Sequence, residues 1–210
     1  MRHTLIILFF SFVLQSVAAQ SGDQVFEFLT LPSSARANAL GGHTVSLVER
    51  DPSLIFHNPA LLGGEMDGMI NLDYMNYIAD VNVGSALFTK AFRERGAWGA
   101  GVHYFHNGKF KGMDENNQST GDFTASDIAV NGFFSYDLSE RWRGGVSMKF
   151  LYSNYDIYTS LGVCFDAGLS YYNSEKEFSF GVVLKNIGAQ LKPYYEDRQK
   201  NAVGYPDGDF

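Results

Sequence analysis

Apolar and polar residues alternate along most of this chain, most clearly between Ser126 and Asn154. There the even positions are mainly apolar and the odd positions mainly polar or small, on both sides of a short polar turn. Successive side chains of a β-strand point to opposite faces. The stretch therefore predicts a hairpin with one apolar face, aromatic near its ends, and one polar face. Val146 and Met148 belong to the apolar face, and Ser147 and Lys149 to the polar one.

The same alternation predicts seven strands of about membrane-spanning length. Their ranges are 69–77, 81–92, 98–106, 126–138, 141–154, 161–172 and 178–187. The links after the second, fourth and sixth strands are short, whereas the link after the third strand, 107–125, is long and polar.

Two architectures fit this pattern. In a soluble β-sandwich the apolar face packs on a second sheet. In an outer-membrane barrel the apolar face meets lipid, aromatic girdles mark the interfaces, and short periplasmic turns alternate with longer outer loops. The alternation of link lengths favours the barrel, because a sandwich has no reason for it.

The N-terminus predicts export. Arg2 precedes an apolar run at 5–14, and small residues end at Ala19, as in a secretory signal peptide covering 1–19. The run is too short for a membrane-spanning helix, which needs roughly 20 residues. We therefore expect Sec-type export and cleavage before Gln20.

Residues 20–68 form a second region, with little strand-like alternation. Ser34 is suited to cap a short helix at 35–40, which Gly41 and Gly42 would end. Residues 44–48 predict a short strand, and 51–62 a turn-rich connector with apolar anchors.

Composition and motifs exclude several functions. The net charge of −7 argues against a nucleic-acid partner. A single cysteine, Cys164, permits no intrachain disulfide and no thiolate metal cluster. No catalytic or phosphate-binding motif occurs, and His103 and His106 face opposite sides of their strand. We expect a protein that is not an enzyme and uses neither metal nor cofactor.

Several charged residues fall on the polar faces of the strands and are predicted to face the lumen of the barrel. They form either a pathway or internal salt bridges that fill the lumen, and we favour salt bridges. They are Asp127, Asp137, Arg143, Lys149, Asp166 and Lys185.

Residues 26–42 and 51–62, followed by 72–82, resemble the PorQ family of type IX secretion system outer-membrane barrels. The step Asn58-Pro59-Ala60 before the first strand resembles the wider FadL class. The resemblance covers about residues 24–196 and is weaker for the related PorV family. Its motif positions, which we expect to be structural, are Arg36, Gly41, Gly42, Asp51, Asn58, Pro59 and Ala60.

The resemblance implies an all-β, antiparallel, up-and-down barrel of FadL-like type in the outer membrane of a Gram-negative bacterium. A short N-terminal plug or periplasmic segment, 20–68, would precede it. The implied partners are outer-membrane lipid, a PorZ-like protein and other proteins of the attachment complex. That machinery trims C-terminal signals and fixes cargo to lipopolysaccharide, and this protein would be its anchor.

The alternative function is a FadL-type transporter of long-chain fatty acids or other hydrophobic molecules. A path for an acyl chain should be apolar, whereas the predicted inner positions hold Gly, Ser, Asn, Asp and Lys. This composition disfavours the transporter.

Seven strands are about half the number found in FadL-like relatives, and single-chain bacterial barrels have an even number. We therefore expect 69–197 to form a partial, open barrel whose first and last strands have unpaired outer edges. The polar tail, 198–210, would then mark a truncated end.

Overall fold

The computed structural model describes residues 26–31, 33–42, 44–76, 81–113, 119–155 and 158–196. The predicted signal peptide and the polar tail lie outside the described residues. The chain divides into two compact units, Met1–Thr30 and Leu31–Phe210. The first contains the short 3-10 helix η1 (Glu27–Thr30), and the second contains every other described element.

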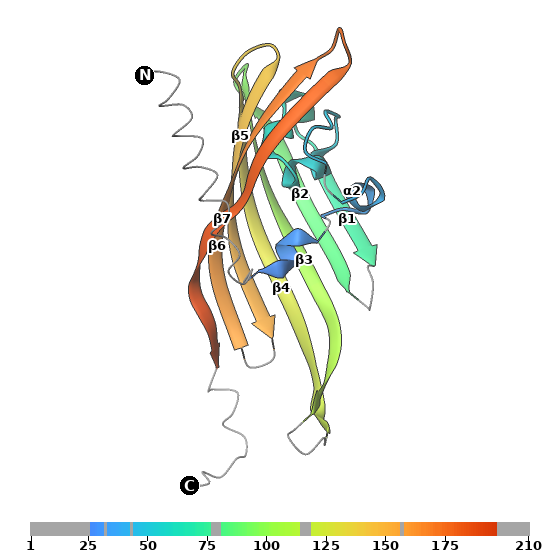
Figure 1. Ribbon diagram of the computed structural model, residues 1–210, viewed down its shortest axis with the longest axis vertical. Coiled ribbons are helices and arrows are strands. Elements are labelled where there is room, and N and C mark those ends of the chain that lie inside the picture. Colours follow the sequence, from blue (N-terminus) through green and yellow to red (C-terminus); the bar gives the residue numbers. More distant parts are fainter. Residues whose placement is uncertain are drawn as a thin grey trace, which may run out of the picture. The chain divides into compact units, whose positions relative to one another are not determined.

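The second unit is built on one antiparallel sheet of seven strands, in the order β1-β2-β3-β4-β5-β6-β7 (Figure 1). Among the described residues, every ladder joins strands that are neighbours in the chain, and none joins β1 to β7. The all-β class and the seven predicted strands are confirmed. The strands are β1 (Ile70–Asn76), β2 (Asn82–Phe92), β3 (Gly96–Met113), β4 (Ser119–Asp137), β5 (Trp142–Tyr155), β6 (Tyr158–Asn173) and β7 (Phe178–Glu196).

The predicted long loop at 107–125 is wrong. β3 continues to Met113 and β4 begins at Ser119, so most of this stretch is a paired hairpin with a register shift after His106. Backbone hydrogen bonds continue a ladder even where side chains are polar, and apolar alternation does not reveal such an extension. β7 likewise extends beyond the predicted end at 187, to Glu196.

The two faces of the sheet follow the predicted alternation. Val146 is 53% exposed, whereas Ser147 and Lys149 beside it are buried. Cys164 is also buried. We call the face that carries Ser147 and Lys149 the inner face, because residues of the N-terminal segment pack against it. The opposite face is the outer face.

Three 3-10 helices of this segment pack on the inner face. They are η2 (Pro52–Phe56), η3 (Pro59–Leu61) and η4 (Gly64–Met66). Asp51 caps η2 by accepting a hydrogen bond from Ser53 N at 2.9 Å, and Asn58 caps η3 in the same way. Each cap is followed by proline, whose fixed φ suits the first helical position. Local sequence thus starts each helix.

Apolar side chains anchor this segment to the sheet. Ile55, Leu62 and Met66 are fully buried and form one cluster with residues of β2, β3 and β4. The sheet contributes Leu87, Ala97 and Phe133. Each of these six side chains removes its apolar surface from water, so the segment and the sheet share one core.

The predicted helix at 35–40 is confirmed as α2 (Ala35–Ala39), and Ser34 Oγ accepts a hydrogen bond from Ala37 N at 3.1 Å. The strand predicted at 44–48 is wrong, because Val45 and Ser46 form a bend and the other three residues have no regular secondary structure. The carbonyl of Val45 accepts a hydrogen bond from the Asn58 side chain at 2.8 Å. This carbonyl therefore binds another part of the N-terminal segment and, in the described part of the chain, does not accept a hydrogen bond from a neighbouring strand. None of the helices in the described ranges has the length and hydropathy needed to cross a membrane.

Candidate functional site

The N-terminal segment lies against three glycines on the inner face, which we call the glycine cradle, with its main chain over two of them and side chains of Asn58 and Pro59 over the third. A Cβ added at any of them would collide with the segment: with Pro59 and Ala60, with Asn58 and Pro59, or with the main chain of Val45. No side chain fits between the sheet and the segment at these points. The glycines are Gly145 of β5, Gly168 of β6 and Gly181 of β7.

Asn58 ties the segment together above the cradle. Its side chain is fully buried and uses both ends of the amide. Nδ2 donates to the carbonyl of Val45 at 2.8 Å, and Oδ1 accepts from Ala60 N at 3.0 Å. The motif residues Asn58, Pro59 and Ala60 are all buried against the sheet. They therefore form the contact that the cradle receives.

A second group of motif residues lies farther from the cradle. Arg36 pairs with Glu49 and with Asp51, the latter at 2.9 Å between Nη1 and Oδ2. The hydrogen bond to Glu49, more than any other contact, raises the pKa of the Arg36 guanidinium. Gly41 and Gly42 have φ angles of +94° and +83°, which only glycine adopts readily at the end of a helix. These residues shape the segment before it reaches the sheet.

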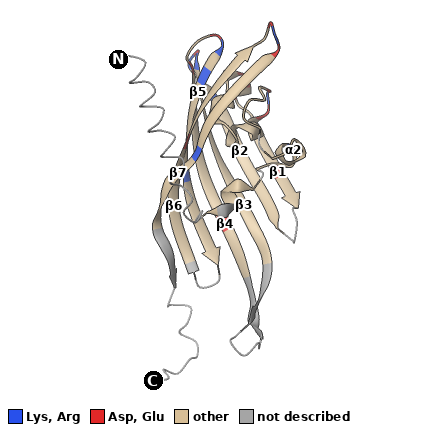
Figure 2. Cartoon of the chain, in the orientation of Figure 1, with Lys and Arg blue, Asp and Glu red and all other residues tan. Residues whose placement is uncertain are grey.

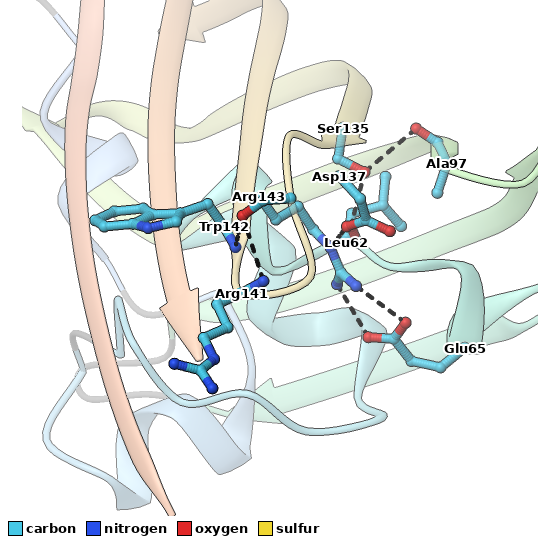
Figure 3. Close-up of polar contacts among 9 residues, drawn as sticks. Leu62, Glu65, Ala97, Ser135, Asp137, Arg141, Trp142 and Arg143 are labelled. Atoms are coloured by element: carbon cyan, nitrogen blue, oxygen red, sulfur yellow. Dashed lines mark hydrogen bonds and ion pairs between the residues drawn. The ribbon is translucent and has the colours of Figure 1, made fainter. Parts of the chain in front are cut away.

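Arg143 fastens the far end of the segment at the short β4–β5 link (Figure 3). Its Nη1 and Nη2 donate to the two carboxylate oxygens of Glu65 at 3.0 and 3.3 Å, and its Nε donates to Asp137 at 2.5 Å. Nearby, Ser135 Oγ donates to the carbonyl of Leu62 at 2.7 Å. Two strands and the segment are therefore joined through one guanidinium.

A charged pair lies buried between β5 and β6. Lys149 Nζ is 2.7 Å from Asp166 Oδ2, and the side chains of these residues are 6% and 1% exposed. Asp166 also accepts hydrogen bonds from Ser147 Oγ at 2.9 Å and from Asn186 N at 2.8 Å. A buried carboxylate with three donors is well compensated for the loss of water. These three contacts indicate that the Asp166 carboxylate has a structural role.

A distortion of β7 supplies one of these donors. Asn186 has a φ of +57°, and the ladder between β6 and β7 shifts register after Phe165. This irregularity places the Asn186 N–H on Asp166 and its side-chain oxygen 2.8 Å from Lys149 Nζ. A β-bulge re-aims backbone groups in this way.

Of the six charged residues predicted to face the lumen, four have an ion pair and two do not, among the described residues. Asp137 lies with Arg143, and Lys149 with Asp166, whereas Asp127 and Lys185 have no ion pair among the described residues. Asp127 is fully buried and accepts hydrogen bonds from Asn107 Nδ2 at 2.8 Å and from Tyr155 OH at 2.9 Å. Lys185 is half-buried on β7.

The sequence did not predict some other contacts between the N-terminal segment and the sheet. His103 is buried and its ring stacks on Phe56, with 3.8 Å between the centroids. Asp67 accepts from Ala91 N at 2.9 Å, and this backbone hydrogen bond in particular lowers the pKa of its carboxyl. The position of His103 on the polar side of its strand was the available signal. Nothing local pointed to Glu65 as the partner of Arg143.

The outer face carries two aromatic rows. Tyr74, Tyr104 and Tyr152 are exposed and lie in one row of register partners that runs across β1 to β5. Near the short links, a second aromatic row is formed by Phe92, Tyr136, Trp142, Tyr171 and Phe178. Charged residues gather mainly at the ends of the strands, near the short links (Figure 2).

In the described part of the chain, no three His, Cys, Asp or Glu side chains are arranged to hold a metal ion. The comparisons with known proteins do not assign the chain to a family. No family model matches its sequence, and no curated protein gives a significant match.

The glycine cradle predicts a sharp difference between two adjacent glycines. Gly145→Ala should lower the free energy of unfolding by about 1–3 kcal/mol, because overpacking forces the backbone of η3 away from the sheet. Gly144→Ala should be nearly neutral, because its Cβ would point outward and meet only Leu138 Cδ1 at 3.5 Å. Urea unfolding and limited proteolysis of residues 44–66 measure both effects. Equal stability and equal proteolysis of the two variants would contradict the cradle.

Arg143 and Arg141 provide a second matched pair. Arg143→Gln should cost about 1.5–3 kcal/mol, the usual range for hydrogen bonds to charged groups. Arg141→Gln should cost less than about 1 kcal/mol, because its contact with Glu175 is exposed and 3.7 Å long. The free energy of unfolding in urea is the measurement, and a larger effect at Arg141 would refute the assignment.

Proposed function

We propose that the sheet is part of the wall of an outer-membrane β-barrel and that the protein is a PorQ-like component of the type IX secretion system. In this role it anchors the attachment machinery through a PorZ-like partner and does not itself process cargo. The inverted burial of the sheet is the observation that carries the membrane part of this proposal.

The sheet exposes most of its large apolar side chains and buries many of its polar ones. A soluble protein does the reverse, and buried Lys and Asp are rare unless paired. The exposed outer-face residues include Leu72, Val130, Val146, Phe150, Phe165, Val182 and Leu184. The buried inner-face residues include Ser85, Asp127, Asn131, Ser147, Lys149, Asp166 and Ser170. Such a pattern is stable when lipid covers the outer face.

The spacing of the aromatic rows supports the same interpretation. Along β3, Tyr104 and Gly96 are the positions that align with the two rows, and the eight residue steps between them span about 26 Å. Transmembrane strands are tilted, and the apolar band of a barrel is about 25 Å tall between its girdles. At a tilt of about 40° the distance along the strand corresponds to about 20 Å of height, so the apolar band of the outer face has about four-fifths of the usual height.

The directions of the two edge strands limit how the sheet can close into a barrel. Because every ladder is antiparallel, β1 and β7 run in the same direction. An antiparallel barrel that closed between them would require an odd number of further strands. Closure has a strong driving force, since an unpaired backbone group in lipid costs several kcal/mol.

The secretion role depends on the resemblance to the PorQ family. The motif residues that carry the resemblance also hold the N-terminal segment in place: Asn58 at the cradle, and Arg36 with Asp51 before η2. A rigidly held segment at one end of a barrel suits an anchor for partner proteins. Loss of such an anchor should affect cargo attachment rather than transport of small molecules.

The fatty-acid transporter is the weaker alternative. An acyl chain on the inner face would meet a buried Lys–Asp pair and buried serines such as Ser147 and Ser170. The apolar side chains that do lie there, such as Ile55 and Phe133, pack against one another. The inner face therefore favours a filled interior over an apolar path.

Arginine on the outer face tests the membrane proposal. Val130 is 52% exposed within the apolar band, and Val130→Arg should cost about 2–4 kcal/mol for folding into phospholipid vesicles. Leu138 is 58% exposed at the β4–β5 link, so Leu138→Arg should be nearly neutral. If the outer face were in water, both substitutions would be tolerated, and the proposal would be wrong. Urea titration of folding in vesicles provides the measurement.

Deletion of the gene tests the secretion role. Cells that lack the protein should release cargo with its C-terminal signal uncut, while uptake of fatty acids remains normal. Complementation with the intact gene is the control. Normal cargo attachment combined with a loss of fatty-acid uptake would favour the transporter.

A further inference from the structure

The outer face contains a groove that neither the fold nor the proposed function requires. Its volume is about 520 Å³, within the usual range for ligand pockets. Apolar residues line it on both sides, and Gly132 of β4 lies within it. The lining side chains of the outer face are Phe134, Val146, Met148, Phe165, Ala167 and Ile187.

The strand register explains the shape of the groove. Gly132, Met148, Phe165 and Ile187 are successive register partners and form one wall. Phe134, Val146 and Ala167 form the other wall, two residues farther along the strands. The side chains of Phe133, Ser147 and Asp166 are buried on the inner face, so these residues supply main chain to the floor.

The groove is elongated, because it extends farther across the strands than along them. The groove crosses the strands from Gly99 of β3 to Ile187 of β7, four strand spacings or about 19 Å. Its two walls are two residues apart, about 7 Å along a strand. A lipid chain extends over about 15 Å, half of the roughly 30 Å hydrocarbon core. The groove is therefore long enough to hold one chain.

We propose that this groove binds one acyl chain of a membrane lipid. The inference rests on the proposed membrane location, because the groove lies between the two aromatic rows, at the level of the hydrocarbon core. A chain in the groove covers main chain that has no side chain above it at Gly132. The wall residues are apolar, and the carboxylate of Asp166 points inward to Lys149. The site thus offers contact surface without any polar partner, which selects a hydrocarbon chain.

Gly132 permits a direct test, because a Cβ at this position would meet nothing within 4 Å. Gly132→Leu should fill the groove without a clash. Gly84 on β2 is the matched control, since a Cβ there also meets nothing and Gly84 does not line the groove. Both glycines lie on outer-face positions of strands, so both leucines add the same apolar surface.

Trp98 reports on occupancy. It is the register partner of Phe134, which lines the groove, and Trp142→Phe leaves it as the only tryptophan. The Trp142→Phe protein and its two glycine variants are reconstituted in dioleoylphosphatidylcholine vesicles with increasing fractions of phosphatidylcholine brominated on one acyl chain. Quenching of Trp98 fluorescence is the measurement.

A chain held in the groove adds a quencher beside Trp98 to those of the surrounding bilayer, so the parent should be quenched more strongly than a variant whose groove is filled. Gly132→Leu should therefore show weaker quenching of Trp98 than the parent at every brominated fraction, whereas Gly84→Leu should behave like the parent. Equal quenching of the parent and Gly132→Leu would overturn the inference and leave the membrane proposal intact. Quenching that declines as the protein-to-lipid ratio rises would indicate a second copy in the groove and would also overturn it. No quenching in fully brominated vesicles would refute the membrane location and the inference with it.

Discussion

The close approach of the N-terminal segment to the backbone of the sheet at the glycine cradle is the contact on which the rest of the structure depends. Gly145, Gly168 and Gly181 let the N-terminal segment lie directly on the sheet, where no Cβ fits. Once the segment is there, its apolar side chains complete the core with Leu87 and Phe133. The inner face then has little space left for anything else, and this explains why small and polar residues predominate on it.

Polar groups on the inner face must find partners within the protein, and most of the charged ones do. Arg143 joins two carboxylates, and Asp166 receives three donors, one of them from a bulged residue of β7. Pairing of this kind permits the inner face to be polar while it is buried. The outer face is left with the large apolar residues, which is the arrangement that a lipid environment stabilises and water does not.

Several features could be predicted because they depend only on neighbouring residues. Alternation with a period of two predicted all seven strands and assigned Val146 and Ser147 to opposite faces. Caps are equally local: Ser34, Asp51 and Asn58 bind backbone N–H groups two or three residues later. Such signals survive whatever the rest of the chain does, because the interacting groups are close in sequence. They predicted the fold class and the helix that Ser34 caps, whereas η2 and η3 lie in a stretch predicted only as a turn-rich connector.

Other features were decided only by tertiary structure. Residues 44–48 are not a strand, because the Val45 carbonyl is used by Asn58 and its main chain lies on Gly181. The pairing of Arg143 with Glu65 and of Lys149 with Asn186 joins residues far apart in the chain. The outer groove arises where Gly132 lies beside the register partners that β5, β6 and β7 bring to it. The sequence by itself determined which side chains share a face; the ladders and the docked segment decided which of them meet, because register and backbone approach depend on contacts across the whole sheet.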